Sequence, residues 1–410
     1  MAVEHRPPAG AVSGRQEKAR PMTKITPQQR AACRLCVTEN LPFALWREPG
    51  DDGFRMICGS GAPRVEPVFG GSGGQPAFVM APFRTDDGNR AWHLPAEVLI
   101  TADGARFWTG AGFSQTPVTP AQSRLAGGAE GGGIQAPATT VPVPEPVSAP
   151  DYEARVTRAV AAIHAGACDK IVLSRVDARD LPVGHDLCAL ADDLARVHPH
   201  AFVSLVSSQP TGTWLTATPE ILLHADDTGL RTMALAGTQW PDPDSDPDTD
   251  PADLIWSDKI VEEQGFVAAF IRDAFAAEGI AGVSETPPAT VRAANLYHLR
   301  SDFRAPAAPE PQLAGLLRRL HPTSAVCGMP RAGAHDFILA EEGDTRSFYT
   351  GYLGPKRVGA GTRLYVNLRS ARVLRDRILL HVGGGIVAAS DPALEWQETV
   401  EKTRTIGQVL

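Results

Sequence analysis

Three ionisable residues near the end of the chain have a spacing that puts them on one side of a helix. Glu395, Glu398 and Lys402 are at positions i, i+3 and i+7 of a segment with helical character. The run His-Val-Gly-Gly-Gly-Ile at 381–386 comes before them, and its pattern predicts a strand that leads into a glycine loop. A glycine loop before a helix is typical of anion-binding sites. The alternative is a helix whose charged side faces solvent.

Two adjacent acids, Glu262 and Glu263, lie in the middle of an earlier segment with helical spacing. Carboxylates on two separate helices that converge on one point would form an oxygen-rich site for a hard divalent cation. Mg²⁺ typically binds one or two carboxylates and completes its coordination with water and substrate oxygens. The alternative is an acidic pair that is exposed to solvent.

Three further candidates for proton transfer or anion binding lie at the ends of apolar runs. Lys170 begins the run Lys-Ile-Val-Leu-Ser-Arg. It is either an edge residue or, if buried near a cation, a general base with a lowered pKa. Glu220 precedes Ile-Leu-Leu, and Arg369 ends the alternating segment 364–369. Arg369 would share a face with Tyr365 there, and its guanidinium suits a carboxylate.

The elements that must position these residues are many short strands and a few long helices. Apolar runs between Gly and Asp turns predict strands at 54–58, 77–80, 97–100, 171–173, 201–206, 214–217, 221–223, 364–369 and 378–382. Helical spacing predicts helices over 152–165, over 256–277 with Ser257 as N-cap, and from about Asp391 onward. Because the strands and helices do not alternate regularly, the pattern indicates an α+β fold with large antiparallel sheets.

The chain of 410 residues divides by composition into four parts. They are a tail at 1–25 that we expect to be disordered, a β-rich part at 26–118, a Gly/Pro-rich loop or linker at 119–150, and a region at 151–410 that holds the candidate residues. Within the last part, the acidic Asp-Pro run at 241–253 is expected to be solvated.

Charge and composition narrow the class of ligand. The formal net charge of −8 argues against nucleic acid or an anionic membrane surface as a partner. An anionic metabolite would need local Arg, Lys or a metal ion to offset that field. The sequence contains no apolar run of about 18 residues and no hydrophobic signal core at its start, so we expect a cytoplasmic protein. Cys33-x-x-Cys36 lacks a second pair at similar spacing, and its context is typical of a helix.

Ten segments, taken in order, resemble the chorismate-binding family of anthranilate, aminodeoxychorismate, isochorismate and salicylate synthases. The resemblance covers about residues 150–405. Its segments are Lys-Ile-Val-Leu-Ser-Arg (170–175), Thr-Pro-Glu (218–220), Leu-Ala-Gly-Thr (235–238), Ser-Asp-Lys-Ile-Val-Glu-Glu-Gln (257–264), Asn-Leu-Tyr-His-Leu (295–299), His-Pro-Thr-Ser-Ala-Val-Cys-Gly-Met-Pro (321–330), Phe-Tyr-Thr-Gly (348–351), Asn-Leu-Arg (367–369), Val-Gly-Gly-Gly-Ile (382–386) and Glu-Trp-Gln-Glu-Thr-Val-Glu-Lys (395–402).

The resemblance implies a single large domain of two antiparallel sheets in a sandwich, flanked by helices, with a site in a deep cleft. Glu263 and Glu398 resemble the family's magnesium ligands, and Glu395 would lie close to the ion or its waters. Lys170 resembles the base and Glu220 the acid. The residues that resemble the substrate cleft are Gly237, Thr238, His298, Tyr349, Arg369, Gly383, Gly385 and Lys402.

The implied chemistry is an Mg²⁺-dependent attack of water on chorismate. Lys170 would activate the water for attack at C2, and protonated Glu220 would donate to the hydroxyl that leaves C4. Relatives that deliver ammonia lack the lysine at position 170, and the aminodeoxychorismate branch has a nucleophilic lysine where this chain has Ala236. Both points favour water as the nucleophile, and the motifs around 321–328 and 365–369 favour an isochorismate synthase, an isomerase of the hydroxymutase type.

Two alternatives remain at this stage. One is a salicylate synthase, which eliminates pyruvate after forming isochorismate, and the other is a non-catalytic partner subunit of the same family. Ile260 and Gln264 depart from the residues that many relatives carry near the metal, and we expect them to weaken metal affinity. The product would enter menaquinone, siderophore or other secondary metabolite synthesis. The protein itself is expected to be a monomer or a weak homodimer.

Overall fold

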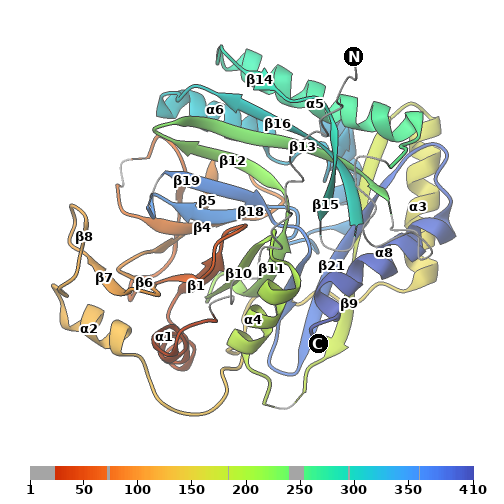
Figure 1. The fold of residues 1–410 in the computed structure, drawn as a ribbon. Helices are drawn as coiled ribbons and strands as arrows, with labels where there is room; N and C mark the ends of the chain where they lie inside the picture. Colours follow the sequence, from red (N-terminus) through yellow and green to blue (C-terminus); the bar gives the residue numbers. More distant parts are fainter. Residues whose placement is uncertain (1–23, 72–73, 183, 240–253, 294–295, 360) are drawn as a thin grey trace, which may run out of the picture.

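The computed structural model describes residues 24–71, 74–182, 184–239, 254–293, 296–359 and 361–410. The acidic run at 241–253 and most of the tail at 1–25 therefore lie outside the described residues. The described chain forms two large antiparallel sheets with helices packed around them (Figure 1). This arrangement confirms the α+β sandwich. None of the helices within the described ranges is long and apolar enough to cross a membrane.

The first sheet is an antiparallel array of eleven strands within the described residues. Its order places β9, from the middle of the chain, beside β21 near the C-terminus, and the two pair in continuous register from Arg377–Asp180 to Ile386–Ile171. In spatial order the strands are β17 (Gly328–Met329), β9 (Lys170–Asp180), β21 (Arg377–Ile386), β20 (Ser370–Val373), β11 (Gly212–Thr218), β10 (Phe202–Ser208), β1 (Phe43–Arg47), β2 (Arg55–Cys58), β6 (Val98–Thr101), β7 (Gly104–Trp108) and β8 (Phe113–Ser114).

The second sheet faces the first across a shared apolar core. Trp46 of β1 and Phe78 of β4 meet in this core at a ring separation of 5.5 Å, and both are fully buried. In spatial order its strands are β14 (Ser284–Glu285), β16 (Leu296–Ala305), β13 (Gly229–Gln239), β12 (Ile221–Asp226), β19 (Thr362–Val366), β18 (Tyr352–Lys356), β4 (Ala77–Ala81), β5 (Arg90–Pro95) and β3 (Arg64–Pro67), while β15 (Ala289–Ala293) pairs with β16.

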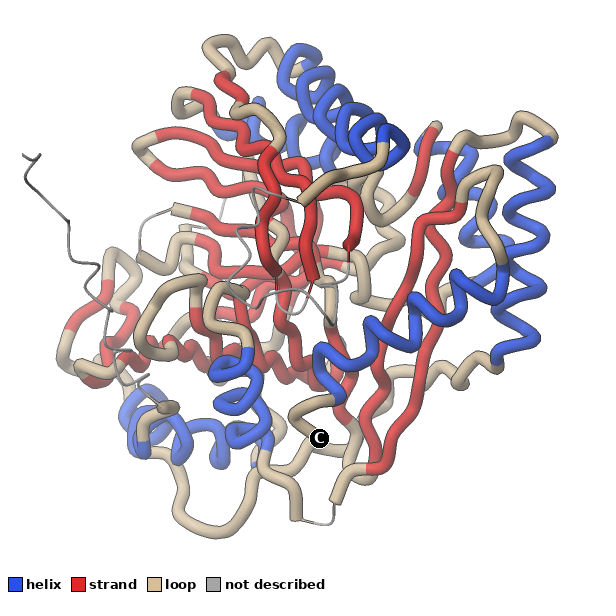
Figure 2. Tube along the Cα trace, turned by 45° about the vertical axis from the view of Figure 1, so that its right-hand side comes forward, coloured by secondary structure: helices blue, strands red, loops and turns tan. Residues whose placement is uncertain are grey.

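The helices cover the outer faces of both sheets (Figure 2). The apolar sides of α5 (Asp258–Ala277) and α6 (Glu310–Leu320) pack on the second sheet. On the first sheet, α1 (Pro27–Thr38) and α4 (Leu187–Val197) cover the end that holds β1 and β2. The other end, at β9 and β21, is covered by α3 (Ala149–His164), α7 (Arg331–Glu342) and α8 (Pro392–Gly407). Residues at the start of α5 and along one side of α8 nevertheless line the same cavity.

Segment 119–150 is partly ordered rather than a free linker. Thr119 caps the helix α2 (Pro120–Gly127), and Pro120 suits its first position because that position needs no backbone donor. Further along, the Arg372 side chain donates to the carbonyl oxygens of Val141 and Pro142 at 2.8 and 2.5 Å. These bonds fix the segment to the first sheet.

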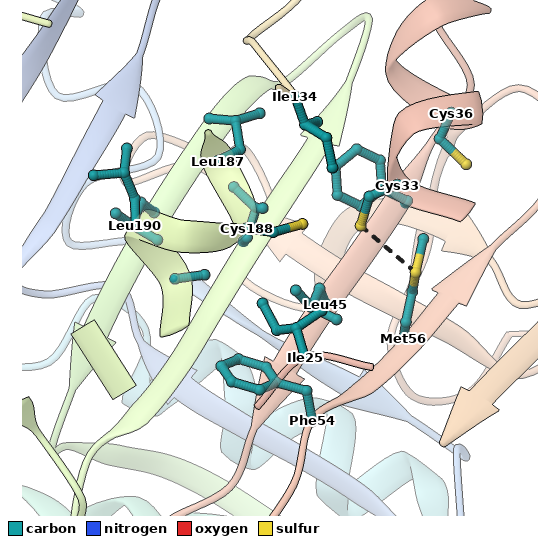
Figure 3. Close-up of a cluster of buried hydrophobic side chains, with 14 of the residues drawn as sticks. Ile25, Cys33, Cys36, Leu45, Phe54, Met56, Ile134, Leu187, Cys188 and Leu190 are labelled. Carbon is teal, nitrogen blue, oxygen red and sulfur yellow. Dashed lines mark hydrogen bonds between the residues drawn. The ribbon is translucent and has the colours of Figure 1, made fainter. Parts of the chain in front are cut away.

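The Cys33-x-x-Cys36 pair lies on α1, as its context predicts, and both side chains are fully buried. Figure 3 shows Cys33 directed at Met56, whose sulfur lies 3.7 Å from the Cys33 Sγ. Burial raises the pKa of the Cys33 thiol well above its ordinary value, so the thiol stays neutral. The pair packs in the core between α1, β2 and α4.

Candidate active site

A cavity of about 450 Å³ opens between α5, α8 and the ends of β9, β13 and β21. Twelve of the thirteen site residues that the sequence predicts line it. The thirteenth, Thr238, follows Gly237 on β13, but its side chain is outside what the structure describes. The twelve are Lys170, Glu220, Gly237, Glu263, His298, Tyr349, Arg369, Gly383, Gly385, Glu395, Glu398 and Lys402.

The glycine run at 383–385 belongs to β21, so the predicted glycine loop is wrong. The run stays extended because it pairs with β9, where Gly383 lies opposite Ser174 and Gly385 opposite Val172. Glycine is needed at Gly383 and Gly385 because a Cβ at either position would collide with neighbouring atoms. A Cβ on Gly385 would lie 2.7 Å from the Lys170 Cε, and one on Gly383 would lie 2.5 Å from the Leu173 carbonyl oxygen. The run therefore makes room for Lys170 instead of forming an anion-binding loop.

Lys170 is the first residue of β9 and its side chain is half-buried. Its Nζ donates to the Glu263 carboxylate on α5. Because side chains alternate along a strand, Lys170, Val172 and Ser174 share one face of β9, and Val172 also lines the cavity. Ser174, two residues further, instead meets Glu342 in the protein interior, where its hydroxyl donates at 2.7 Å. This face of β9 therefore lines the cavity only at the Lys170 end.

Glu220 lies in the short turn between β11 and β12 and is 5% exposed. Burial raises the pKa of its carboxyl to about 8, against the opposing charges of Arg369 and Lys170. The side chain is therefore mostly protonated at neutral pH. A buried carboxyl that stays protonated at neutral pH is what a general acid requires.

Arg369 is held beside Glu220 by a chain of hydrogen bonds. The Gly237 carbonyl can only accept, so the His298 Nδ1 donates to it at 2.6 Å. His298 Nε2 is then the acceptor for the Arg369 Nη2, at 2.9 Å. Burial and the Arg369 charge lower the pKa of His298 to about 3, which keeps this imidazole neutral. Burial lowers the pKa of Arg369 itself to about 10, so the guanidinium remains charged at neutral pH.

The predicted strand through Arg369 is wrong at its end. β19 stops at Val366, and Arg369 has a positive φ of 47° that takes the backbone out of the sheet. Tyr365, which was expected on the same face as Arg369, instead stacks on Phe202 in the core at 4.0 Å. The turn after the strand is what aims the guanidinium at the cavity.

The helix α8 presents its three predicted residues to the cavity from one side, as their spacing indicates. Asp391 caps its first turn by accepting from the backbone of Ala393 and Leu394, and Pro392 follows it. Lys402 Nζ donates to the Gly383 carbonyl at 2.9 Å and to Glu398 Oε1 at 2.5 Å. Glu395 Oε1 accepts from Ser390 at 2.6 Å. A Cβ on Gly384 would lie within 4 Å of the carboxylates of Glu395 and Glu398.

The donor set suits a hard cation that keeps some of its own water. Glu263 of α5 lines the same cavity as Glu395 and Glu398 of α8. Carboxylate oxygens are ligands that Mg²⁺ prefers. In the described part of the chain, no three His, Cys, Asp or Glu side chains are close enough to hold a metal unaided. Mg²⁺ is commonly bound through one or two carboxylates together with substrate oxygens, and the residues fit that mode.

Ile260 and Gln264, which depart from the family pattern, lie in different surroundings. Ile260 lines the cavity and packs over Gly237. Gln264 is 1% exposed and points away from the cavity, since its Nε2 donates to the Ala234 carbonyl at 3.2 Å and to Ser301 at 3.3 Å. Gln264 therefore ties α5 to the second sheet, and the expectation that it weakens metal binding has no contact to support it.

Sequence reasoning missed three cavity-lining residues that carry polar or ionisable side chains, Ser257, Thr350 and His381. His381 packs beneath Tyr349 at 5.5 Å and against Trp214 at 5.1 Å. Burial lowers its pKa to about 3. The signal for it was present, because His381 is two residues before Gly383 and so shares its face of the strand. Ser257 is the N-cap of α5, as predicted, but its side chain makes no capping bond.

Comparison with known proteins agrees with this geometry. A family model described as chorismate binding enzyme matches residues 131–410. The chain belongs to this family. It is 34% identical to "Isochorismate synthase DhbC" of Bacillus subtilis over 277 residues, which cover 65% of this chain and 68% of that protein. It is also 34% identical to "Salicylate biosynthesis isochorismate synthase" of Pseudomonas aeruginosa, with coverage of 63% and 54%.

Solved structures support the fold over nearly the whole chain. The isochorismate synthase MenF from Escherichia coli has a TM-score of 0.74 at 23% identity, and the match covers 93% of this chain and 91% of that one. Anthranilate synthase component I from Streptococcus pneumoniae has a TM-score of 0.62 at 16% identity, with 89% of each chain covered. Both structural matches cover more of the chain than the family model, so they extend into the β-rich part that precedes residue 131.

Proposed function

We propose that this protein is an isochorismate synthase, which converts chorismate to isochorismate with Mg²⁺ as cofactor. One observation carries the proposal. Lys170 and the buried, protonated Glu220 line the same cavity, and Lys170 lies near enough for its charge to act on the pKa of Glu220. A base and an acid in one cavity are what the addition of water and the loss of a hydroxyl require. The names of the relatives at 34% identity support the same reaction.

The cavity offers positive charge for a substrate with two carboxylates. Among its described lining residues, Arg369 and Lys402 are the cationic side chains other than Lys170. Arg369 is half-buried beside His298 and Tyr349, which are both uncharged at neutral pH. A carboxylate that reaches Arg369 gains a charge-assisted hydrogen bond in a site of low dielectric constant. When bound, Mg²⁺ would draw on the carboxylates of Glu263 and Glu398 and supply charge for the second carboxylate.

The residues divide the proton transfers between them. Lys170, as the neutral amine, takes a proton from a water molecule whose oxygen forms the new bond at C2 of chorismate. The ring double bonds shift, the bond from C4 to its hydroxyl breaks, and Glu220 donates its proton so that the hydroxyl leaves as water. One water is consumed and one is released, which makes the overall change an isomerisation. In the structure Lys170 donates to Glu263, so Lys170 can act as the base only after it leaves this contact and gives its own proton to solvent.

Product analysis tests this proposal. The protein is incubated with chorismate, Mg²⁺ and ammonium, and isochorismate, salicylate, pyruvate and anthranilate are separated and quantified. We expect isochorismate as the main product, with salicylate and pyruvate minor. Pyruvate that appears in step with chorismate loss would replace the proposal by a salicylate synthase. Anthranilate as the main product would end the assignment of water as nucleophile, and no turnover at all would favour a non-catalytic partner subunit.

A further inference from the structure

A second cavity, of about 550 Å³, lies beside the candidate active cavity. Its lining comes from the end of α4 with the segment after it and from β11, β13, β15 and β16, and it shares the wall residues Pro219, Leu235 and Arg369 with the first cavity. Sites for small organic ligands commonly have volumes of about 300–1,000 Å³. The second cavity is thus large enough for a ligand of its own.

Positive charge dominates the lining of this second cavity. Three arginines line it, Arg292 on β15, Arg300 on β16 and the shared Arg369, and no acidic side chain is among its described lining residues. Arg300 donates to the neighbouring Asp302, which offsets part of its charge, whereas Arg292 has no ion-pair partner among the residues that the structure describes. In a chain with a net charge of −8, this is a local field that attracts anions.

The remaining wall is mostly apolar, with one polar atom left unsatisfied. Val197, Ala201 and Met233 contribute hydrocarbon surface to it. His198 also lines the cavity and is 3% exposed. Its Nε2 lies 2.9 Å from the Thr405 carbonyl oxygen, but its buried Nδ1 has no hydrogen-bond partner in the described structure. A buried polar atom of this kind is usually satisfied by a ligand or a water.

We infer that the second cavity binds a small carboxylate that carries an apolar ring. The carboxylate faces Arg292 and Arg300, and the ring packs on the apolar wall. This ligand class follows from the presence of arginines and an apolar wall in one cavity. A small inorganic anion would leave the apolar wall uncovered, and a neutral ring would leave the arginines without an anionic partner. This inference does not depend on the reaction that the first cavity performs.

Benzoate is the probe that matches this chemistry, and its binding to the full chain is measured by isothermal titration calorimetry. Acetate serves as the comparison because it has the carboxylate without the ring. We expect one benzoate site per chain, with an affinity at least about tenfold above that for acetate, because the ring removes apolar surface from water. Equal affinities for the two anions would show that the apolar wall takes no part.

Variants then locate the bound benzoate. The double variant Arg292→Gln/Arg300→Gln should weaken binding by about tenfold, since it removes two positive partners of the carboxylate. The control Arg64→Gln/Arg106→Gln removes the same charge from two exposed residues that do not line either cavity, and it should bind as the parent does. Each variant is first shown to have the parent's thermal unfolding profile.

A third variant separates the two cavities. Lys402 lines only the first cavity, so Lys402→Gln should leave benzoate affinity unchanged if the ligand is in the second. The opposite pattern, in which Lys402→Gln abolishes binding and the arginine double variant does not, would place benzoate in the first cavity and overturn the inference. Absence of benzoate binding at millimolar concentration would also overturn it. None of these readouts uses turnover, so they stand apart from the test of the proposed function.

Discussion

The buried carboxyl of Glu220 makes a quantitative prediction about pH. Burial raises its pKa to about 8, so the protonated form is present below pH 8 and is lost as the pH rises above it. With that pKa, about 90% of the carboxyl is protonated at pH 7 and about 9% at pH 9. If Glu220 is the general acid, kcat/KM, which reports groups of the free enzyme, should fall about tenfold between these two pH values. Arg369, with a pKa of about 10, should cause a second loss only at higher pH.

The assay follows isochorismate formation from chorismate over pH 6–10 in the parent and in Glu220→Gln. Glutamine keeps the shape of the side chain, but its amide is too weak an acid to transfer a proton, so we expect kcat to fall roughly 10²–10⁴-fold and the step near pH 8 to disappear. Glu130→Gln, on an exposed residue, is the control and should keep the parent profile. A step near pH 8 that persists in Glu220→Gln would show that another group controls the alkaline limb, and the acid would lie elsewhere.

Three further predictions concern the other residues around the cavity. Lys170→Ala should lower kcat roughly 10²–10⁴-fold while chorismate binding, measured by calorimetry, is largely kept; near-normal turnover would mean that the base is another group. Glu263→Gln should raise the Mg²⁺ concentration needed for half-maximal activity at least about tenfold, whereas the exposed neighbour Glu262→Gln should not, and activity that survives EDTA would remove the metal from the mechanism. Glu342→Gln should lower the free energy of unfolding in urea by about 3–5 kcal/mol, because it removes the charged partner of the buried Arg346, and a loss no larger than that of Glu341→Gln, which breaks a more exposed ion pair with Arg158, would contradict this.

Local sequence patterns predicted many of the strands and helices. The strand at β4, the helix α5 with its N-cap Ser257, and the start of α8 at Asp391–Pro392 all lie where the sequence places them. These elements depend on short-range physics, namely apolar periodicity and capping. The ends of strands that are set by pairing with a distant strand could not be predicted in this way. β9 runs to Asp180, well beyond the apolar residues 171–173 that predict it, because β21 pairs along its length.

The sequence by itself determined which chemical groups the cavity would contain and which of them share a helix face. Spacing alone puts Glu395, Glu398 and Lys402 on one side of α8, because the helix repeat is a local property. Ordered motifs over most of the chain resemble one family, and the family model matches residues 131–410.

Only the tertiary structure decided how those groups act on one another. Lys170 and Glu263 are 93 positions apart, and they meet because the β9 end and α5 border the same cavity. The raised pKa of Glu220 comes from burial, which no local pattern around it encodes. Gln264 turned toward the second sheet rather than the cavity for the same reason, since its direction is set by how α5 packs on that sheet. Contacts between distant segments have no periodicity for a sequence to display, so they appear only when the sheets are assembled.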